Sequence, residues 1–171
     1  MIRAVGEDDF VAIASITNHY IATTAIHFAY EPIEARELWA GWAAGARRYP
    51  WLVATEGGEV VGFAKAGPWR DRSAYRWTTE VGLYLAPGAV GRGLGRALYT
   101  DLLDELARRK FRSAIAGIAL PNEPSIRLHR AFGFESVGIV RDAGFKLGRW
   151  HDVEFWQKRF AVGPDRPDLV G

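Results

Sequence analysis

The stretch Tyr84-Leu-Ala-Pro-Gly-Ala-Val-Gly-Arg-Gly-Leu-Gly-Arg-Ala-Leu98 decides the fold class. A strand ends at its start, Gly91, Gly93 and Gly95 alternate in its middle, and an amphipathic helix begins at its end. Glycines have no Cβ atom, so they let a ligand approach the backbone closely. Unpaired N–H groups at the start of a helix favour a phosphate group. The loop therefore predicts a phosphate or pyrophosphate site.

This glycine loop differs from the two best-known phosphate loops. No Gly-Lys-Ser/Thr follows it, so it is not a Walker loop. Its Gly-x-Gly-x-Gly spacing comes after three earlier strands, whereas a Rossmann fingerprint follows the first strand. Glycine turns between a strand and a helix are also common, so the loop alone leaves an ordinary turn open.

Apolar spacing around the loop predicts an alternation of strands and helices. Helices are expected from Asp8 or Asp9 to Ile21, from about Glu34 to Arg48, from about Gly93 to Arg109, and from Asn122 to Gly133. The expected strands are Ile2–Val5, Trp51–Glu56, Glu59–Ala66, Thr78–Leu85, Arg112–Ala119, Phe134–Val140 and Asp152–Phe160. This order predicts an α/β (α+β) domain over residues 1–160, with a mixed central sheet of about seven strands and helices on both faces. The tail 161–171 is expected to fray.

Composition excludes several classes of protein. The 171 residues correspond to one domain. The absence of cysteine excludes a disulfide framework, a thiolate metal site and a cysteine nucleophile. A net charge of +2 gives no strong field for nucleic acid, no apolar run is long enough to span a bilayer, and the first residues lack the apolar region of a signal peptide. We therefore expect a cytoplasmic protein that binds neither nucleic acid nor membrane.

Several separated motifs resemble the GNAT acetyltransferases, specifically the branch that acetylates phosphinothricin and methionine sulfoximine or sulfone. The resemblance covers about Ile2 to Phe160. Its motifs are, in order, Asn18-His-Tyr-Ile-Ala-Thr-Thr24 with Phe28, Tyr75-Arg-Trp-Thr-Thr-Glu80, Gly91-Arg-Gly-Leu-Gly-Arg96, Gly117-Ile-Ala-Leu-Pro-Asn122, His129-Arg-Ala-Phe-Gly-Phe134 and Gly144-Phe-Lys-Leu-Gly-Arg-Trp-His-Asp-Val153. It implies the GNAT fold and an acetyl-CoA-dependent N-acetyltransferase for a small carboxylate-bearing amine. A different acceptor (a protein N-terminus or a polyamine) and a non-catalytic acyl-CoA-binding module stay open.

The same resemblance implies which residues bind acetyl-CoA. The glycine loop and helix start would hold its pyrophosphate, through Gly91, Arg92, Gly93, Leu94, Gly95 and Arg96. The backbone of Leu83, Tyr84 and Leu85 would pair with its pantetheine arm like an added strand, and Asn122 would contact it near the thioester. Val90 stands where the family has Gln or Arg, so we expect weakened binding, with Arg92 and Arg96 compensating on phosphate oxygens.

Two residues are candidates for proton transfer. Acetyl transfer needs a neutral amine, so a group must accept the amine proton. Glu80 matches the proposed catalytic glutamate of the branch, although strand alternation leaves an outward, solvated Glu80 open. His129 stands where the branch commonly has a histidine, which can protonate the departing thiolate. A histidine that packs within its own helix is the alternative.

The resemblance also implies an acceptor pocket that includes Phe28, Tyr75 and Arg76. The Arg76 guanidinium matches a carboxylate bidentately, while a core aromatic and a solvated loop arginine are the alternatives for these residues. His151 and Asp152 lack companion ligands at helical or hairpin spacing, so no metal is expected.

The aromatic C-terminal region predicts a homodimer. Phe145, Trp150, Phe155, Trp156 and Phe160 fall within sixteen residues. If one face of their hairpin covers the core, the other face leaves a tryptophan that needs cover. Tryptophan and arginine are enriched together in interface cores, and the resembling branch is usually dimeric. Helices that bury both faces of the hairpin are the alternative.

Overall fold

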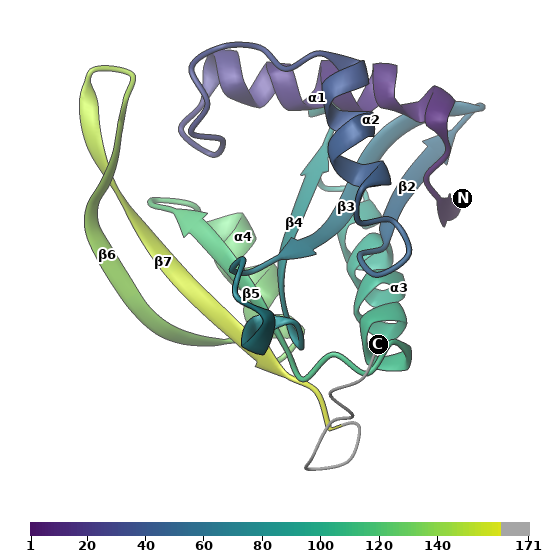
Figure 1. Cartoon of the computed structure of the whole chain (residues 1–171). Helices are drawn as coiled ribbons and strands as arrows, with labels where there is room; N and C mark the ends of the chain where they lie inside the picture. The colour runs from purple at the N-terminus through teal and green to yellow at the C-terminus, as the bar shows by residue number, and fades with distance from the viewer. Residues whose placement is uncertain (162–171) are drawn as a thin grey trace.

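A sheet of seven strands forms the centre of residues 1–161, the part of the chain that the computed structural model describes (Figure 1). The strand order is β1-β2-β3-β4-β5-β7-β6. The strands are β1 (Ile2–Ala4), β2 (Trp51–Glu56), β3 (Glu59–Pro68), β4 (Thr78–Leu85), β5 (Ser113–Ala119), β6 (Glu135–Lys146) and β7 (Arg149–Arg159). The α-helices are α1 (Phe10–Thr23), α2 (Ala35–Ala43), α3 (Leu94–Arg108) and α4 (Glu123–Ala131). The predicted order of elements and the mixed sheet are thereby confirmed.

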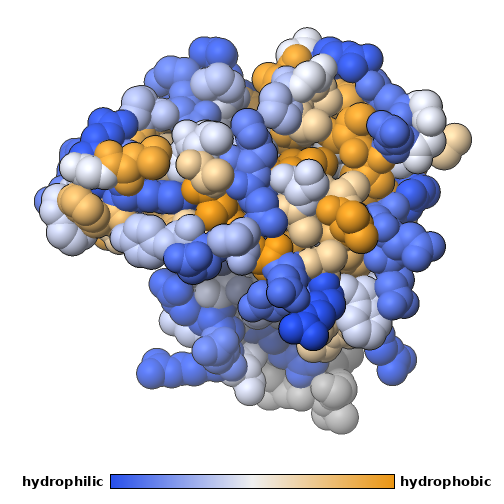
Figure 2. Space-filling view, turned by 90° about the horizontal axis from the view of Figure 1, so that it is seen from above, coloured by the Kyte–Doolittle hydropathy of each residue, from blue (hydrophilic) through white to orange (hydrophobic). Residues whose placement is uncertain are grey.

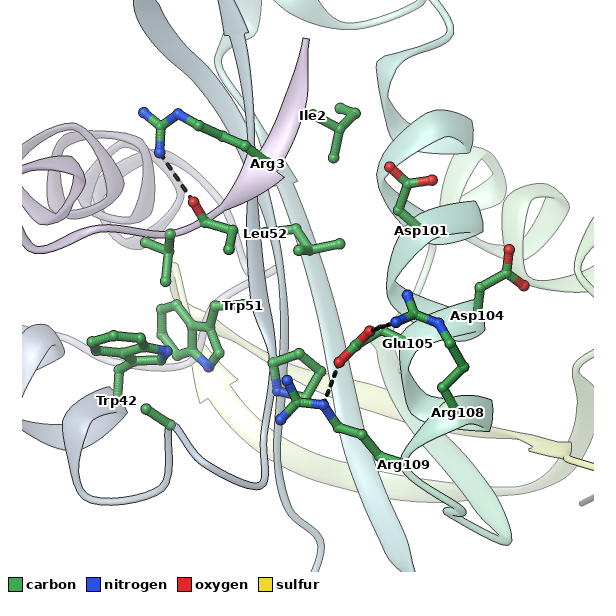
Figure 3. Close-up of a pocket in the computed structure, with 14 residues that line it drawn as sticks. Ile2, Arg3, Trp42, Trp51, Leu52, Asp101, Asp104, Glu105, Arg108 and Arg109 are labelled. Carbon is green, nitrogen blue, oxygen red and sulfur yellow. Dashed lines mark hydrogen bonds and ion pairs between the residues drawn. The ribbon is translucent and has the colours of Figure 1, made fainter. Parts of the chain in front are cut away.

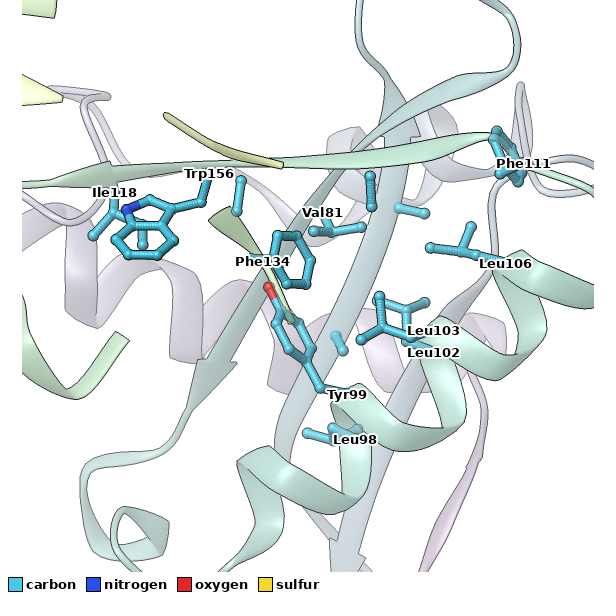
Figure 4. Packing of buried hydrophobic residues seen from close by; sticks show 14 of the residues in the cluster. Val81, Leu98, Tyr99, Leu102, Leu103, Leu106, Phe111, Ile118, Phe134 and Trp156 are labelled. Atoms are coloured by element: carbon cyan, nitrogen blue, oxygen red, sulfur yellow. The ribbon is translucent and has the colours of Figure 1, made fainter. Parts of the chain in front are cut away.

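Helices cover both faces of the sheet, and each face has its own apolar cluster. The α1 and α2 side packs on Val53, Phe63 and Trp51, while α3 and α4 lie on the opposite side (Figure 1). The larger cluster lies under α3, where Leu98, Tyr99 and the leucines one turn further on are buried, and Val81 and Trp156 belong to the same cluster (Figure 4). The helix therefore owes its position to the leucines spaced along one of its faces.

Helix α2 is shorter than predicted. It ends at Ala43 instead of Arg48, and turns follow it, with the Gly45 N–H donating to the Trp42 carbonyl and the Tyr49 N–H donating to the Gly45 carbonyl. Glycine costs about 1 kcal/mol relative to alanine inside a helix. Gly41 already lies inside this short helix, and with a second glycine at position 45 the backbone continues in turns although the apolar spacing continues.

The C-terminal hairpin is longer than predicted. Its strands continue to Lys146 and from Arg149, and only Leu147 and Gly148 connect them. Both connecting residues have positive φ, 51° and 77°, as a two-residue hairpin turn requires. The hydrogen-bond ladder between β6 and β7 is interrupted between Val140 and Gly144. Because the alternation of residues is broken there, the sequence does not show that β6 continues beyond Val140.

Residues 162–171, most of the expected C-terminal tail, lie outside the described residues. Within residues 1–161 no helix is both long and apolar enough to cross a membrane.

Candidate active site

Strands β4 and β5 lie side by side only at one end, and then they separate (Figure 1). Their parallel pairing covers Thr78, Thr79 and Glu80, and Glu80 opposite Ile115 is the last pair. Beyond this pair the two strands diverge, and we call the gap between Val81–Leu85 of β4 and Ala116–Ala119 of β5 the fork. A cavity of about 510 Å³ lies in it. Its walls come from both faces of the sheet, with Gly82 and Tyr84 from one face and Leu83 and Leu85 from the other. The cavity therefore passes through the sheet, and Glu80 lies next to its inner end.

The glycine loop forms one mouth of this cavity. Gly93 is the N-cap residue of α3, and both Gly91 and Gly93 have a φ of +81°. No atom lies within 4 Å of the position that a Cβ would occupy at either glycine, so this backbone borders open space. The N–H groups of the first helical turn have no partner within the helix. This combination suits the pyrophosphate group that the sequence predicts here.

Most of the residues predicted to hold a cofactor lie together around the cavity. The lining includes Leu83, Tyr84, Leu85, Gly91, Gly93, Gly95, Arg96, Asn122 and His129. Asn122 caps α4, since its side chain accepts a hydrogen bond from the Ser125 N–H at 3.3 Å.

Two residues of the predicted set lie apart from the cavity lining. The Arg92 guanidinium forms an ion pair with Glu56 at 2.8 Å, and Leu94 packs against the apolar core. Val90, the departure from the family pattern, lies at the cavity with 58% of its surface exposed. Of the two arginines expected to compensate for it, Arg96 is therefore the one beside the cavity.

Glu80 lies on the α1 side of the sheet, because Val81 and Leu85 are buried under α3. Its side chain keeps contact with solvent. Burial of the surrounding site raises the pKa of Glu80, and the charges of Lys65 and Arg70 partly oppose this rise. A carboxylate with a raised pKa is a stronger proton acceptor than an ordinary glutamate.

Tyrosines from two elements enclose the space beside Glu80. Burial, together with the nearby Glu80 charge, raises the pKa of Tyr84 to about 12. The Tyr84 ring stacks on Phe63, with ring centres 5.3 Å apart. Tyr20 on α1 meets the Tyr84 ring edge-on at 5.4 Å and donates its hydroxyl hydrogen to the Leu85 carbonyl at 2.7 Å. These contacts fix the end of β4 that the cofactor is expected to use.

The loop between α1 and α2 is held over the site by the end of the β6–β7 hairpin. The Lys146 ammonium donates to the Ile21 and His27 carbonyls, both at 2.6 Å. The Tyr30 hydroxyl donates to the Phe145 carbonyl. Phe28 packs so closely on Gly144 that a Cβ at this glycine would lie 2.4 Å from its ring. Phe28, predicted to wall the acceptor pocket, is thus anchored against the hairpin.

His129 is buried on α4 with both ring nitrogens engaged. Nδ1 lies 2.8 Å from the Ser125 carbonyl, which only accepts, so Nδ1 carries the proton. Nε2 then accepts from the Tyr99 hydroxyl at 2.9 Å. Burial lowers the pKa of His129, and its bond to Ser125 only partly offsets this effect. The residue lines the cavity, yet it also bonds within its own helix, which was the alternative, and it is held as a neutral imidazole at neutral pH. Its role as a proton donor stays a prediction.

The predicted acceptor residues Tyr75 and Arg76 lie outside the cavity lining. Tyr75 is in a short 3-10 helix and is 43% exposed. The Arg76 guanidinium lies over the Trp77 ring at 5.4 Å, and its carbonyl accepts from Arg48. The structure therefore leaves the role of both residues a prediction.

Sequence reasoning missed Lys65 and Tyr99, which both border the site. Tyr99 lies among the leucines of α3, and its position in the sequence is typical of a buried core aromatic. Nothing near it in the sequence indicates its hydrogen bond to His129. Lys65 stands in an apolar strand, and a charged residue among apolar ones is the one feature of the sequence that could have drawn attention to it.

A second cavity of about 450 Å³ lies at the other edge of the sheet, between β1, β2 and α3 (Figure 3). Trp42, Trp51 and Leu52 form its apolar part. Three carboxylates line it, from Asp101, Asp104 and Glu105, and Glu105 is paired with Arg108 and Arg109 of the same helix. Among residues 1–161 no group of three His, Cys, Asp or Glu side chains is placed to hold a metal ion.

Comparison with known proteins identifies relatives over nearly the whole chain. Residues 13–134 match the Acetyltransferase (GNAT) family. A phosphinothricin N-acetyltransferase of Streptomyces viridochromogenes is 45% identical, over 97% of this chain and 91% of its own length. An L-methionine sulfoximine/L-methionine sulfone acetyltransferase of Salmonella typhimurium is 37% identical, over 91% of this chain and 92% of its own length.

Solved structures agree with these relatives. A GNAT superfamily phosphinothricin acetyltransferase from Sinorhizobium meliloti, solved with acetyl-CoA, superposes with a TM-score of 0.94 at 33% identity. The match covers all of this chain and 94% of the other. A Salmonella typhimurium acetyltransferase, also solved with acetyl-CoA, has the same TM-score at 35% identity and covers 99% and 98% of the two chains. With the forked sheet, the glycine loop and these matches together, the chain belongs to the GNAT family of acetyltransferases.

Proposed function

We propose that this enzyme transfers the acetyl group of acetyl-CoA to the amino group of a small carboxylate-bearing amine, of the phosphinothricin or methionine sulfoximine/sulfone type. The observation that carries the proposal is the position of Glu80, at the last pair of β4 and β5, where the cavity begins. The names of the relatives support the acceptor class.

Acetyl-CoA would supply the activated acetyl group when bound in the fork. The first-turn amides of α3 and the Arg96 side chain face the space for its phosphates. Within residues 1–161 no strand pairs with Leu83–Leu85 on the β5 side, and only the Leu85 carbonyl is taken, by the Tyr20 hydroxyl, so the remaining backbone groups can pair with the pantetheine arm. Within this arrangement, a backbone N–H near Leu85 polarises the thioester carbonyl, and Asn122 lies at the β5 side of the cavity.

Glu80 removes one proton from the ammonium form of the acceptor. The free amine then bonds to the thioester carbon, the C–S bond breaks to release the CoA thiolate, and the surplus proton of the nitrogen passes to solvent. Holding amine and thioester together in the fork supplies much of the rate, because the reaction becomes effectively unimolecular. In its imidazolium form His129 carries its second proton on Nε2, which faces the Tyr99 hydroxyl, so this proton reaches the departing thiolate through that hydroxyl. Its lowered pKa makes that form scarce at neutral pH, so a thiolate formed there also takes its proton from water.

An acceptor panel tests this proposal. Release of CoA is followed with phosphinothricin, methionine sulfone, a polyamine and a peptide with a free N-terminus. We expect kcat/KM for the two acid-bearing amino compounds to exceed the others by roughly tenfold or more, since a charge-assisted bond to the acid group adds that much. Preference for the polyamine or the peptide would refute the proposed acceptor. Binding of acetyl-CoA without acetylation of any acceptor would favour the non-catalytic module.

We also propose that the enzyme is a homodimer, in which β6 and the end of the hairpin lie at or near the interface. Of the two tryptophans in the hairpin, Trp156 is buried in the apolar cluster that α3 and α4 cover. Phe155 packs edge-on against Trp69 at 5.6 Å. The exposed aromatic side chains are instead Phe145 and Trp150, at 46% and 59%.

Other apolar side chains of β6, the last strand of the sheet, are also exposed (Val137, Ile139 and Val140). Figure 2, seen from above, shows apolar side chains at the surface on the left, where the hairpin ends in Figure 1. Exposed apolar surface of this kind is typical of an interface. Sedimentation at micromolar concentration should give a species near twice the chain mass of 19.0 kDa, and a single species at the chain mass would contradict the dimer.

A further inference from the structure

Lys65 reaches across the sheet toward the fork. It pairs with Gly82 in the β3–β4 register, while Glu80 pairs with Gly67. Lys65 and Glu80 are therefore diagonal neighbours on the same face of the sheet. A Cβ at Gly82 would lie 3.5 Å from Cε of Lys65, so the lysine stem lies over this glycine. Because Gly82 lines the cavity, the lysine extends along the edge of the cavity on the Glu80 face of the sheet. We call the space beside Glu80 on this face the acceptor space.

The ammonium of Lys65 has no acceptor among residues 1–161. No hydrogen bond or ion pair of the described residues reaches its Nζ, which lies over the Trp51 ring, 5.3 Å from the ring centre. Burial lowers the pKa of Lys65, and the charge of Glu80 partly opposes this effect. An ammonium has three donors, and at the half-buried Lys65 none of them is taken by a residue of the described chain, so all three are available to a bound ligand.

The neighbouring cations do not share this property. The Lys146 ammonium is satisfied by two carbonyls at 2.6 Å. Arg70 is exposed and lies over the Trp69 ring at 4.2 Å. Among these three cations near the acceptor space, Lys65 is the one that is half-buried and has its donors unused.

We propose that Lys65 binds an oxyanion of the acceptor, a carboxylate or a phosphinate, and so determines the preference for acid-bearing amines. This inference rests on the proposed function and assigns a specificity residue to it. Diagonal neighbours on adjacent strands stand about 7–8 Å apart, within reach of long side chains. One small molecule can therefore present its amino group to Glu80 and its acid group to Lys65. A polyamine would bring a second cation to the same place and be repelled.

The test compares three acceptors in the wild-type enzyme and in Lys65→Met. Phosphinothricin carries a carboxylate and a phosphinate, methionine sulfone carries one carboxylate, and the amide of methionine sulfone carries neither. We expect Lys65→Met to lower kcat/KM for acid-bearing acceptors by roughly 10–100-fold, mainly through KM, because a hydrogen bond to a charged group is lost. The value for the amide should change little. Lys65→Arg keeps the charge and should retain the preference for acids.

The pattern of losses identifies the bound group. A loss with both acids indicates the carboxylate, and a loss with phosphinothricin alone indicates the phosphinate. An equal loss with the amide would overturn the inference, because Lys65 would then act through Glu80 or through the fold. No loss with any acceptor would overturn it as well.

Two controls separate the possible failures. Acetyl-CoA affinity measured by calorimetry should be unchanged in Lys65→Met, and Lys65→Gln replaces it if the methionine variant does not fold. If the wild-type enzyme shows no higher kcat/KM for acid-bearing acceptors than for the amide, the proposed function and the inference are refuted together. A wild-type enzyme that prefers acids, with the same preference in the variants, refutes only the role of Lys65.

Discussion

Replacing Glu80 by glutamine is expected to lower kcat by roughly 10²–10⁴-fold, as for loss of a general base. Glutamine keeps the shape of the side chain but cannot accept the amine proton. The affinity for acetyl-CoA should stay nearly constant, because Glu80 lies beside the fork and not among the residues that line the cavity. Steady-state kinetics and calorimetry on the same preparation check both parts.

The dependence of kcat/KM on pH tests the role of Glu80 as general base independently. Glu80 acts as a base only when ionised, so kcat/KM rises as the pH rises through its pKa. Since burial raises that pKa, the rising limb should lie at higher pH than for an ordinary glutamate, and it should vanish in Glu80→Gln. Glu135, an exposed glutamate at the start of β6, provides the matched control Glu135→Gln. Near-normal kcat at neutral pH in Glu80→Gln would leave Glu80 a structural residue.

Replacing Gly93 by valine is expected to weaken acetyl-CoA binding by roughly 10²-fold, through loss of charge-assisted bonds to first-turn amides. The Cβ of residue 93 would project into the open space at the cavity mouth, and a branched side chain there occupies the place of the phosphates. Calorimetry with acetyl-CoA measures the loss directly.

A positive φ makes this substitution strained wherever it is placed, so the control must carry the same strain. Gly148, in the β6–β7 turn, has a φ of +77° and also has open space around its would-be Cβ. Gly148→Val should lose stability in thermal unfolding yet bind acetyl-CoA normally. Equal acetyl-CoA affinity in Gly93→Val and the wild type would refute the assignment of the pyrophosphate site to this loop.

The order of elements and the cofactor loop were predictable from local sequence. Leucines at helical spacing define α3, and Asn122 with Pro124 marks the start of α4, as the structure confirms. Gly91 and Gly93 adopt a backbone conformation that other residues rarely take, so the sequence carries this information at single positions. The outer half of the hairpin was not predictable, because the irregularity at Val140–Gly144 interrupts the alternation of apolar residues.

The face on which Glu80 lies was decided only by the tertiary structure. Its strand alternates in a way that suits either face, and the packing of Val81 and Leu85 under α3 selects one. The fork has the same origin, since β5 turns away from β4 beyond Glu80 to pair with β7 along its full length.

By itself, the amino-acid sequence determined the glycine loop, the helices beside it and the presence of a glutamate in β4. These features depend on neighbours along the chain and on the conformational freedom of single residues. Only the tertiary structure brought Lys65 beside Glu80 and the Tyr99 hydroxyl to His129. Such pairs arise from strand register and helix packing between distant segments. The distant segments that form such pairs are held together by the burial of apolar surface elsewhere in the molecule. No short stretch of sequence therefore predicts the pairs.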